Sequence, residues 1–150
     1  MKRPIRKQSE RGNALLEFAI GFFMLWAIFA GVYQFGYAFY VYNALLTSVS
    51  NAAQLGSKLG YDTGDTAAYT TTIKNMVLYG DETVGAKTVV PNLTAANVSV
   101  SAHPDAAGMP TYIEVAITGY SVDALFKSYT LTNKPRVTTL YYGQISCASC

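Results

Sequence analysis

The sequence is poor in the residues from which most active sites are built. Its 150 residues contain one histidine, His103, and two cysteines, Cys147 and Cys150. A structural zinc site takes about four ligands, more than these residues supply. No glycine-rich phosphate loop, Ser-x-x-Lys motif or pair of carboxylates at an evident site occurs in the sequence, and a lone histidine in a Pro-Asp loop is usually solvated. We therefore expect no enzyme, no metal site and no cofactor.

Charged residues are also scarce, and they are unevenly distributed. Asp, Glu, Lys and Arg make up 13% of the chain, and between Asn13 and Ser57 the only formal charge is Glu17. Residues 1–12 hold five basic side chains and one acidic one, whereas the six basic and eight acidic side chains of residues 13–150 leave that part mildly acidic. This balance does not indicate a nucleic-acid partner. A basic flank before an apolar stretch predicts a cytoplasmic N-terminus and an exported C-terminal part.

Proline is absent between Pro4 and Pro91, which permits a long uninterrupted helix. An apolar run extends from Ala14 to Val32, close to the roughly 20 residues that cross the hydrocarbon core of a bilayer. We expect a membrane-spanning helix over residues 13–60 whose second part continues into water and packs against the rest of the chain. The apolar residues of that second part recur at helical spacing, at Leu45, Val49, Ala52 and Ala53.

Glu17 stands inside this apolar run. A carboxylate in hydrocarbon costs a few kcal/mol even on the gentlest insertion scales, so an acid at such a position indicates a function. If the bond after Gly12 is cut, Asn13 becomes the first residue and its free amine lies one helical turn from the Glu17 carboxylate. The amine of a neighbouring subunit, offset along the helix axis, could then pair with Glu17, which would make the acid an assembly contact.

The segment G-N-A-L-L-E-F-A from Gly12 to Ala19 resembles the class III signal peptide of prepilins, and its form is most similar to TadE-like pseudopilins of tight-adherence (Flp) pilus systems. In such proteins a membrane aspartyl prepilin peptidase cuts after the glycine. The resemblance implies cleavage between Gly12 and Asn13 and assembly contacts from Glu17 and Phe18. Major Flp pilins usually carry Glu-Tyr and are much shorter, which favours a minor pilin here.

The resemblance implies a minor pilin or pseudopilin that acts in biogenesis of a Tad (Flp) type IV-like pilus and serves adhesion or surface colonisation. It divides the chain into a class III leader peptide (1–12), a transmembrane and assembly helix (13–60) and an exported head domain (61–150). The implied partners are the prepilin peptidase, other minor and major pilins and the inner-membrane assembly platform. The implied location is the bacterial inner membrane, with the head in the periplasm and, after assembly, on the pilus or cell surface.

Two other interpretations of the apolar run remain open. A conventional secretory signal peptide has an apolar region of about 7 to 15 residues and a small-residue cleavage site, which the Ala-Ile-Phe-Ala of residues 27–30 imitates poorly. A plain single-pass anchor needs only the apolar run and the basic flank. The alternative function is therefore an unprocessed, membrane-anchored periplasmic binding or scaffold domain, although such an anchor does not explain Glu17.

Two pairs of residues offer further candidate contacts. Ala27 and Gly31 form a small-xxx-small pair, which would let another helix approach closely in lipid, although both residue types are common in membrane helices. Cys147 and Cys150 would meet oxidising conditions in an exported chain, where a small disulfide loop or an intermolecular bridge is plausible. A redox site would need a following helix to stabilise the thiolate, which we do not expect, so we favour a structural or incidental role.

The head domain is predicted to contain a second helix. Asp65 is a candidate N-cap and Gly80 a candidate C-cap of a helix over residues 66–79. Its apolar residues share one face and are expected in the core: Tyr69, Ile73, Met76 and Val77.

Alternating apolar and polar residues predict β-strands in the remainder of the head. The expected elements are strands at 98–102, 113–117, 129–132 and 136–142, a hairpin loop at 103–110 and a short helical piece at 123–127. The fold class is therefore α+β: a long N-terminal transmembrane helix extends into a small periplasmic domain with a second helix and an antiparallel sheet. The resemblance implies the same pilin-like plan.

Overall fold

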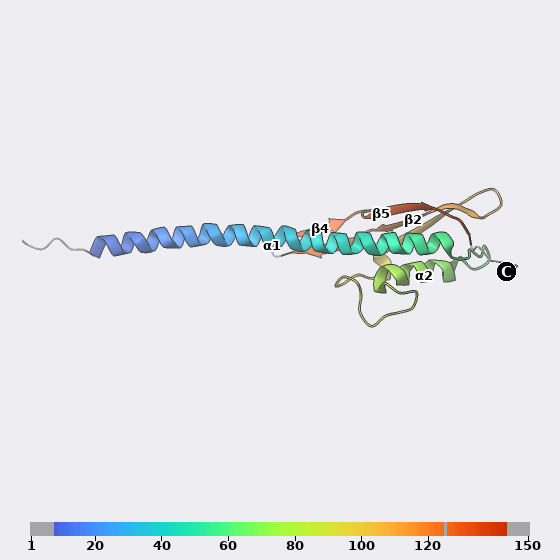
Figure 1. The fold of residues 1–150 in the computed structure, drawn as a ribbon, viewed down its shortest axis with the longest axis horizontal. Helices are drawn as coiled ribbons and strands as arrows, with labels where there is room; N and C mark the ends of the chain where they lie inside the picture. The colour runs from blue at the N-terminus through green and yellow to red at the C-terminus, as the bar shows by residue number, and fades with distance from the viewer. Residues whose placement is uncertain (1–7, 125, 144–150) are drawn as a thin grey trace, which may run out of the picture.

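The dominant element of the fold is one long helix. The computed structural model describes residues 8–124 and 126–143, and α1 (Gln8–Lys58) takes up 51 of them. At about 1.5 Å per residue this helix is roughly 75 Å long. Its N-terminal half projects freely, whereas its C-terminal half lies within the head (Figure 1). The α+β plan with a long N-terminal helix is confirmed.

The helix begins earlier than the predicted end of the leader. The leader is predicted over residues 1–12, but residues 8–12 are already helical, so the bond between Gly12 and Asn13 lies inside α1. Extending an existing helix costs much less than nucleating one, and no proline after Pro4 stops the extension.

The second helix, α2 (Thr66–Tyr79), has both predicted caps. The Asp65 carboxylate accepts hydrogen bonds from the backbone N–H groups of Ala67 and Ala68, each at 3.2 Å. Gly80 adopts a left-handed conformation with φ of 73°, which glycine reaches without steric cost. Of the predicted apolar face, Tyr69, Ile73 and Val77 are buried and Met76 is half-buried.

The strands form two antiparallel sheets, where the sequence predicts one. The larger sheet has the order β1 (Val98–Pro104), β2 (Pro110–Ile117), β5 (Arg136–Leu140), and the smaller one pairs β3 (Tyr120–Asp123) with β4 (Ser128–Leu131). A short 3-10 helix, η1, precedes β1 and extends over Ala95–Asn97.

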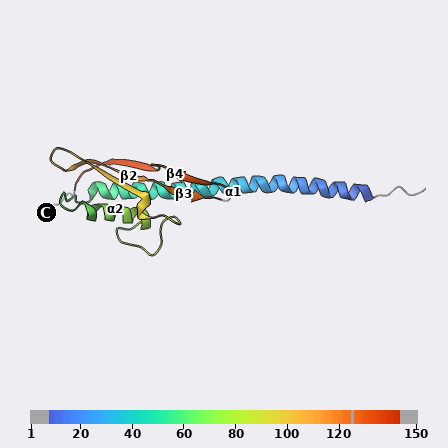
Figure 2. The same cartoon turned by 180° about the vertical axis from the view of Figure 1, so that it is seen from behind.

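The helical piece predicted at residues 123–127 is wrong. Asp123 instead ends β3 and Ser128 begins β4, and no helix occurs among the described residues between them. The composition of this stretch favours a helix, but pairing between β3 and β4 outweighs that preference. In this pairing the Ser121 and Thr130 hydroxyl oxygens lie 2.9 Å apart. The resulting β3–β4 hairpin extends along α1 toward its N-terminus (Figures 1 and 2).

The core lies where α1 passes between α2 and the larger sheet (Figures 1 and 2). The apolar residues predicted to pack in the second half of α1 are all completely buried: Leu45, Val49, Ala52 and Ala53. They meet Ile73 from α2 and Ile113 from β2 in one cluster. The second half of α1 is therefore the central element of the head.

Gly56 lets α1 approach α2 and β2 closely. A Cβ at this position would lie 2.6 Å from Ile113 Cδ1 and 2.8 Å from Ile73 Cδ1. We expect Gly56→Leu to lower the free energy of unfolding by about 3 kcal/mol, because overpacking forces these neighbours to move. Gly36→Leu is the control, since a Cβ at Gly36 meets nothing within 4 Å. Equal denaturant midpoints for the two variants would contradict the prediction.

Three tyrosines close the C-terminal end of α1. The buried Tyr69 donates its hydroxyl hydrogen bond to the Gly56 carbonyl oxygen at 2.7 Å. Tyr141 donates to the Leu59 carbonyl oxygen and accepts from the Tyr61 N–H, both at 3.0 Å. Burial raises the pKa of Tyr69 well above that of a free tyrosine, and the nearby Tyr141 and Tyr61 add to the increase.

The raised pKa of Tyr69 predicts a loss of stability in alkali. Between the unfolded-state pKa of about 10 and the higher folded-state value, the folded chain keeps a proton that the unfolded chain has lost, so stability falls as pH rises above about 10. We expect Tyr69→Phe to flatten this fall and to cost about 1 kcal/mol at neutral pH through the lost hydrogen bond. The exposed Tyr142 gives the control variant, Tyr142→Phe. An unchanged alkaline slope in Tyr69→Phe, measured by denaturant unfolding across pH, would count against this account.

Candidate functional site

The free part of α1 is apolar on every side. We call residues 12–29 the stem: each of their side chains is exposed, and the head first covers α1 at Ala30. Phe18 is 72% exposed and Phe23 69%. The helix Gly12–Lys58 is long and apolar enough to cross a membrane, and little of its most apolar part is buried. A helix that is apolar all round requires lipid or other apolar helices about it.

The predicted assembly residues lie on this stem. Glu17 is exposed, and no hydrogen bond or ion pair joins it to another of the residues 12–124 and 126–143. Phe18 stacks on Phe22, with ring centroids 6.4 Å apart. Asn13 precedes Glu17 by four residues, a rise of about 6 Å. The stem therefore presents a carboxylate and an aromatic ring to whatever surrounds it, as an assembly contact requires.

The other predicted contact residues are only partly placed. Ala27 is exposed and Gly31 half-buried, and a Cβ at Gly31 would meet nothing within 4 Å. Space for a second helix therefore exists at this pair, whose role in helix packing stays a prediction. Cys147 and Cys150 lie outside the described residues.

A glutamine that sequence reasoning missed joins α1 to the β3–β4 hairpin. The Gln34 side chain is buried, with an exposed fraction of 6%. Its Nε2 donates to the Lys127 carbonyl oxygen at 3.0 Å, and its Oε1 accepts from the Phe126 N–H at 2.9 Å. One amide thus satisfies two backbone groups of the hairpin, which we call the Gln34 clamp.

The same hairpin reaches back to the stem. The Phe126 ring meets the Trp26 ring edge to face, with centroids 6.2 Å apart and planes at 80°. Phe126 nevertheless remains 61% exposed. The head therefore contacts α1 two helical turns nearer the N-terminus than the Gln34 clamp.

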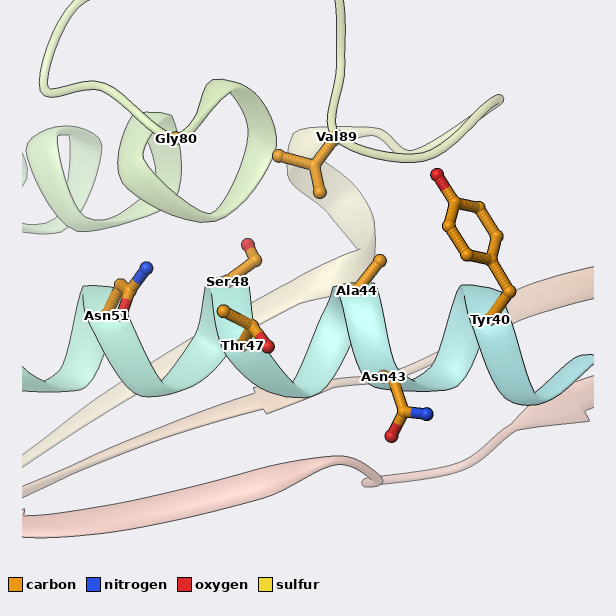
Figure 3. A pocket seen from close by; sticks show the side chains of 8 residues that line it. All are labelled: Tyr40, Asn43, Ala44, Thr47, Ser48, Asn51, Gly80 and Val89. Carbon is orange, nitrogen blue, oxygen red and sulfur yellow. The ribbon is translucent and has the colours of Figure 1, made fainter.

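Two shallow grooves flank the second half of α1. The groove in Figure 3 holds about 370 Å³ between α1 and the chain that follows α2. Its lining is Tyr40, Asn43, Ala44, Thr47, Ser48, Asn51, Gly80 and Val89. Ser48 already donates its hydroxyl hydrogen bond to the Val77 carbonyl oxygen. Its lining combines hydroxyls and amides, with no acid, histidine or cysteine among the residues that form it.

The second groove, the hairpin groove, is almost wholly apolar and lies between α1 and the β3–β4 hairpin. It also holds about 370 Å³. Its lining is Phe35, Ala38, Phe39, Tyr42, Val122, Tyr129 and Leu131. Phe35 and Phe39 are mostly exposed, so the groove prolongs the apolar surface of the stem into the head.

The only histidine, His103, lies in β1 instead of the predicted loop, and its ring stacks on Tyr112 with centroids 4.3 Å apart. Among the residues that the structure describes, no group of three or more His, Cys, Asp or Glu side chains could hold a metal ion. Most of the large apolar side chains that are exposed in the described residues lie on α1.

Comparison with known proteins finds one match, within α1. The family model described as TadE-like protein matches residues 12–54. This match begins at the predicted cleavage site, covers the whole stem and ends within the part of α1 that the head encloses. No curated protein and no solved structure matches the chain. The resemblance to TadE-like proteins that the sequence shows is thus confirmed over residues 12–54.

Proposed function

Because residues 12–54 match the TadE-like family, we propose that this chain is a minor pilin or pseudopilin in the biogenesis of a Tad (Flp) type IV-like pilus. The observation that carries the proposal is the coincidence of three features in one segment. The family match, the exposed apolar stem and the single carboxylate at Glu17 all fall within residues 12–54.

In this proposal α1 first acts as a single-pass anchor in the inner membrane, with the head in the periplasm. The prepilin peptidase then cuts after Gly12, which creates a positive amine on Asn13. That amine binds the Glu17 carboxylate of a neighbouring pilin, and the pairing offsets the cost of holding a carboxylate in an apolar surrounding. Apolar contacts between stems, Phe18 among them, supply the rest of the association.

The head serves as a displayed or capping domain without catalytic activity of its own. Its partners are other minor and major pilins and the assembly platform of the inner membrane, and its biological role is adhesion or surface colonisation. The exposed stem supports this proposal, because a free helix with apolar side chains on all sides can associate with lipid before assembly and with other stems afterwards.

The test is the N-terminal residue and the intact mass of the protein recovered from native membranes. The proposal expects a chain that starts at Asn13 and lacks the mass of residues 1–12. A chain that starts at Met1 would overturn processing and leave a static anchor.

One observation favours that static anchor, an unprocessed membrane-attached periplasmic binding or scaffold domain. Helix α1 continues without a break across the bond between Gly12 and Asn13, and a protease must open such a helix before it can cut. Under this alternative Met1 is retained, and the protein does not co-isolate with pilins.

A further inference from the structure

We propose that the β3–β4 hairpin makes a second contact with the lipid bilayer, in which Phe126 lies among acyl chains and Lys127 faces anionic headgroups. We call these two residues the hairpin tip. The inference rests on the membrane-anchored stem of the proposed function and goes beyond it, because it assigns a membrane site to the head.

The hairpin tip contacts α1 within the stem, at Trp26. If the hydrocarbon core begins near Ala14, just after the basic flank, roughly 20 helical residues carry the chain to about Tyr33 at the opposite edge. Trp26 then lies about 10 Å inside that edge. The Phe126 ring is in contact with Trp26, at 6.2 Å between centroids. A head attached in this way therefore brings Phe126 below the surface of the bilayer.

The backbone of the hairpin tip forms its hydrogen bonds within the protein. A peptide group placed in hydrocarbon needs a partner inside the protein, because no water is available there. The Phe126 N–H and the Lys127 carbonyl oxygen both find this partner in the Gln34 side chain. This pairing explains why a glutamine is buried at the edge of an apolar span. The Phe126 side chain takes no part in the clamp and stays exposed.

The hairpin tip combines an exposed aromatic side chain with a basic one. Phe126 is 61% exposed, and through its contact with Trp26 it adds to the apolar surface of the stem. The Lys127 ammonium lies 5.6 Å from the centre of the Tyr129 ring, which is on the same hairpin. A lysine beside an apolar insertion can extend its charge to the headgroup layer, where anionic lipids attract it. The occupant of this surface is therefore a lipid leaflet.

Depth-resolved fluorescence tests the proposal, because the chain has a single tryptophan. In full-length protein reconstituted at low density into phosphatidylethanolamine–phosphatidylglycerol vesicles, Trp26→Phe combined with Phe126→Trp leaves one indole, at position 126. We expect blue-shifted emission that acyl-chain-brominated phosphatidylcholine quenches strongly and aqueous acrylamide quenches weakly. The control carries Trp26→Phe with Val84→Trp, at a position that is 73% exposed on the head, and should show the opposite pattern.

The result that overturns the proposal is equal acrylamide quenching at positions 126 and 84 with no effect of brominated lipid. Wild-type protein separates this failure from failure of the anchor, because Trp26 itself must be quenched by brominated lipid if the stem is inserted. A chain that starts at Met1 but keeps a lipid-quenched indole at position 126 would reject filament function and support the hairpin contact.

The role of Gln34 is tested in the same background. We expect Gln34→Leu to remove most of the brominated-lipid quenching at position 126. Without the glutamine amide, the Phe126 N–H and the Lys127 carbonyl oxygen need water as their hydrogen-bond partner, so the tip leaves the hydrocarbon. Gln54→Leu makes the same change at an exposed position of α1 and should leave the quenching intact. Full lipid quenching in Gln34→Leu would overturn the role assigned to the clamp.

Discussion

Gly12→Glu is expected to abolish processing, so that the recovered protein starts at Met1 and keeps residues 1–12. The resemblance implies a peptidase that recognises glycine before the cut bond. A subsite that accepts glycine, whose side chain is a single hydrogen atom, would not fit a long charged side chain. The substitution should not disturb the chain itself, because a Cβ at Gly12 would meet nothing within 4 Å. N-terminal sequencing and intact mass of protein from native membranes measure the result.

Gln8→Glu is the matched control for added charge. It places the same carboxylate four residues earlier, within the predicted leader, and should be processed normally. Denaturant unfolding of both variants should show wild-type stability, since the core of the head begins far along α1, at Val41. Recovery of Gly12→Glu as a chain beginning at Asn13 would contradict a peptidase that reads this glycine.

The second helix is predictable from sequence in full because its signals are local. Asp65 and Gly80 act on backbone groups within four residues of themselves, and the buried residues share one face at helical spacing. The second half of α1 is predictable for the same reason, because the spacing of Leu45 and Val49 indicates a buried face whatever element covers it. Helix caps and apolar periodicity can both be read from a short window of sequence.

The smaller sheet, which pairs β3 with β4, is only half predictable in this way. The strand predicted at 129–132 corresponds to β4 (Ser128–Leu131), but β3 has only four residues, too few for alternation to outweigh the helix-favouring residues that follow it. The stability of the two strands comes from pairing with each other and from packing beside α1, and neither interaction is visible in a local window. The division of the predicted single sheet into two has the same origin.

The candidate site shows the same limit. Glu17 is evident from sequence because it is the only charge in a long apolar run. Gln34 is not, since its partners lie 92 and 93 residues away in the chain. The one available signal is an amide among the aromatic residues that follow Tyr33, and its role depends on a hairpin whose connecting residues, 123–127, the sequence assigns to a helix.

Glu17→Gln is expected to leave membrane insertion intact and to weaken association with other pilins. The amide keeps the shape of the carboxylate and is easier to place in lipid, but it no longer attracts the amine of a neighbouring Asn13. Removing one member of a desolvated ion pair costs about 2 kcal/mol or more, which corresponds to roughly thirtyfold weaker association. Co-isolation with partner pilins and the number of pili per cell measure the loss.

Leu16→Gln is the control, since it adds the same amide one position earlier on the exposed stem and keeps Glu17. It should co-isolate with pilins far better than Glu17→Gln, and equal losses would show that any polar change in the stem is harmful. A further comparison identifies the partner of the carboxylate. The amine exists only after cleavage, so Glu17→Gln should weaken association no further once Gly12→Glu has blocked processing. Independent, additive losses from the two substitutions would mean that Glu17 pairs with a group other than the new N-terminus.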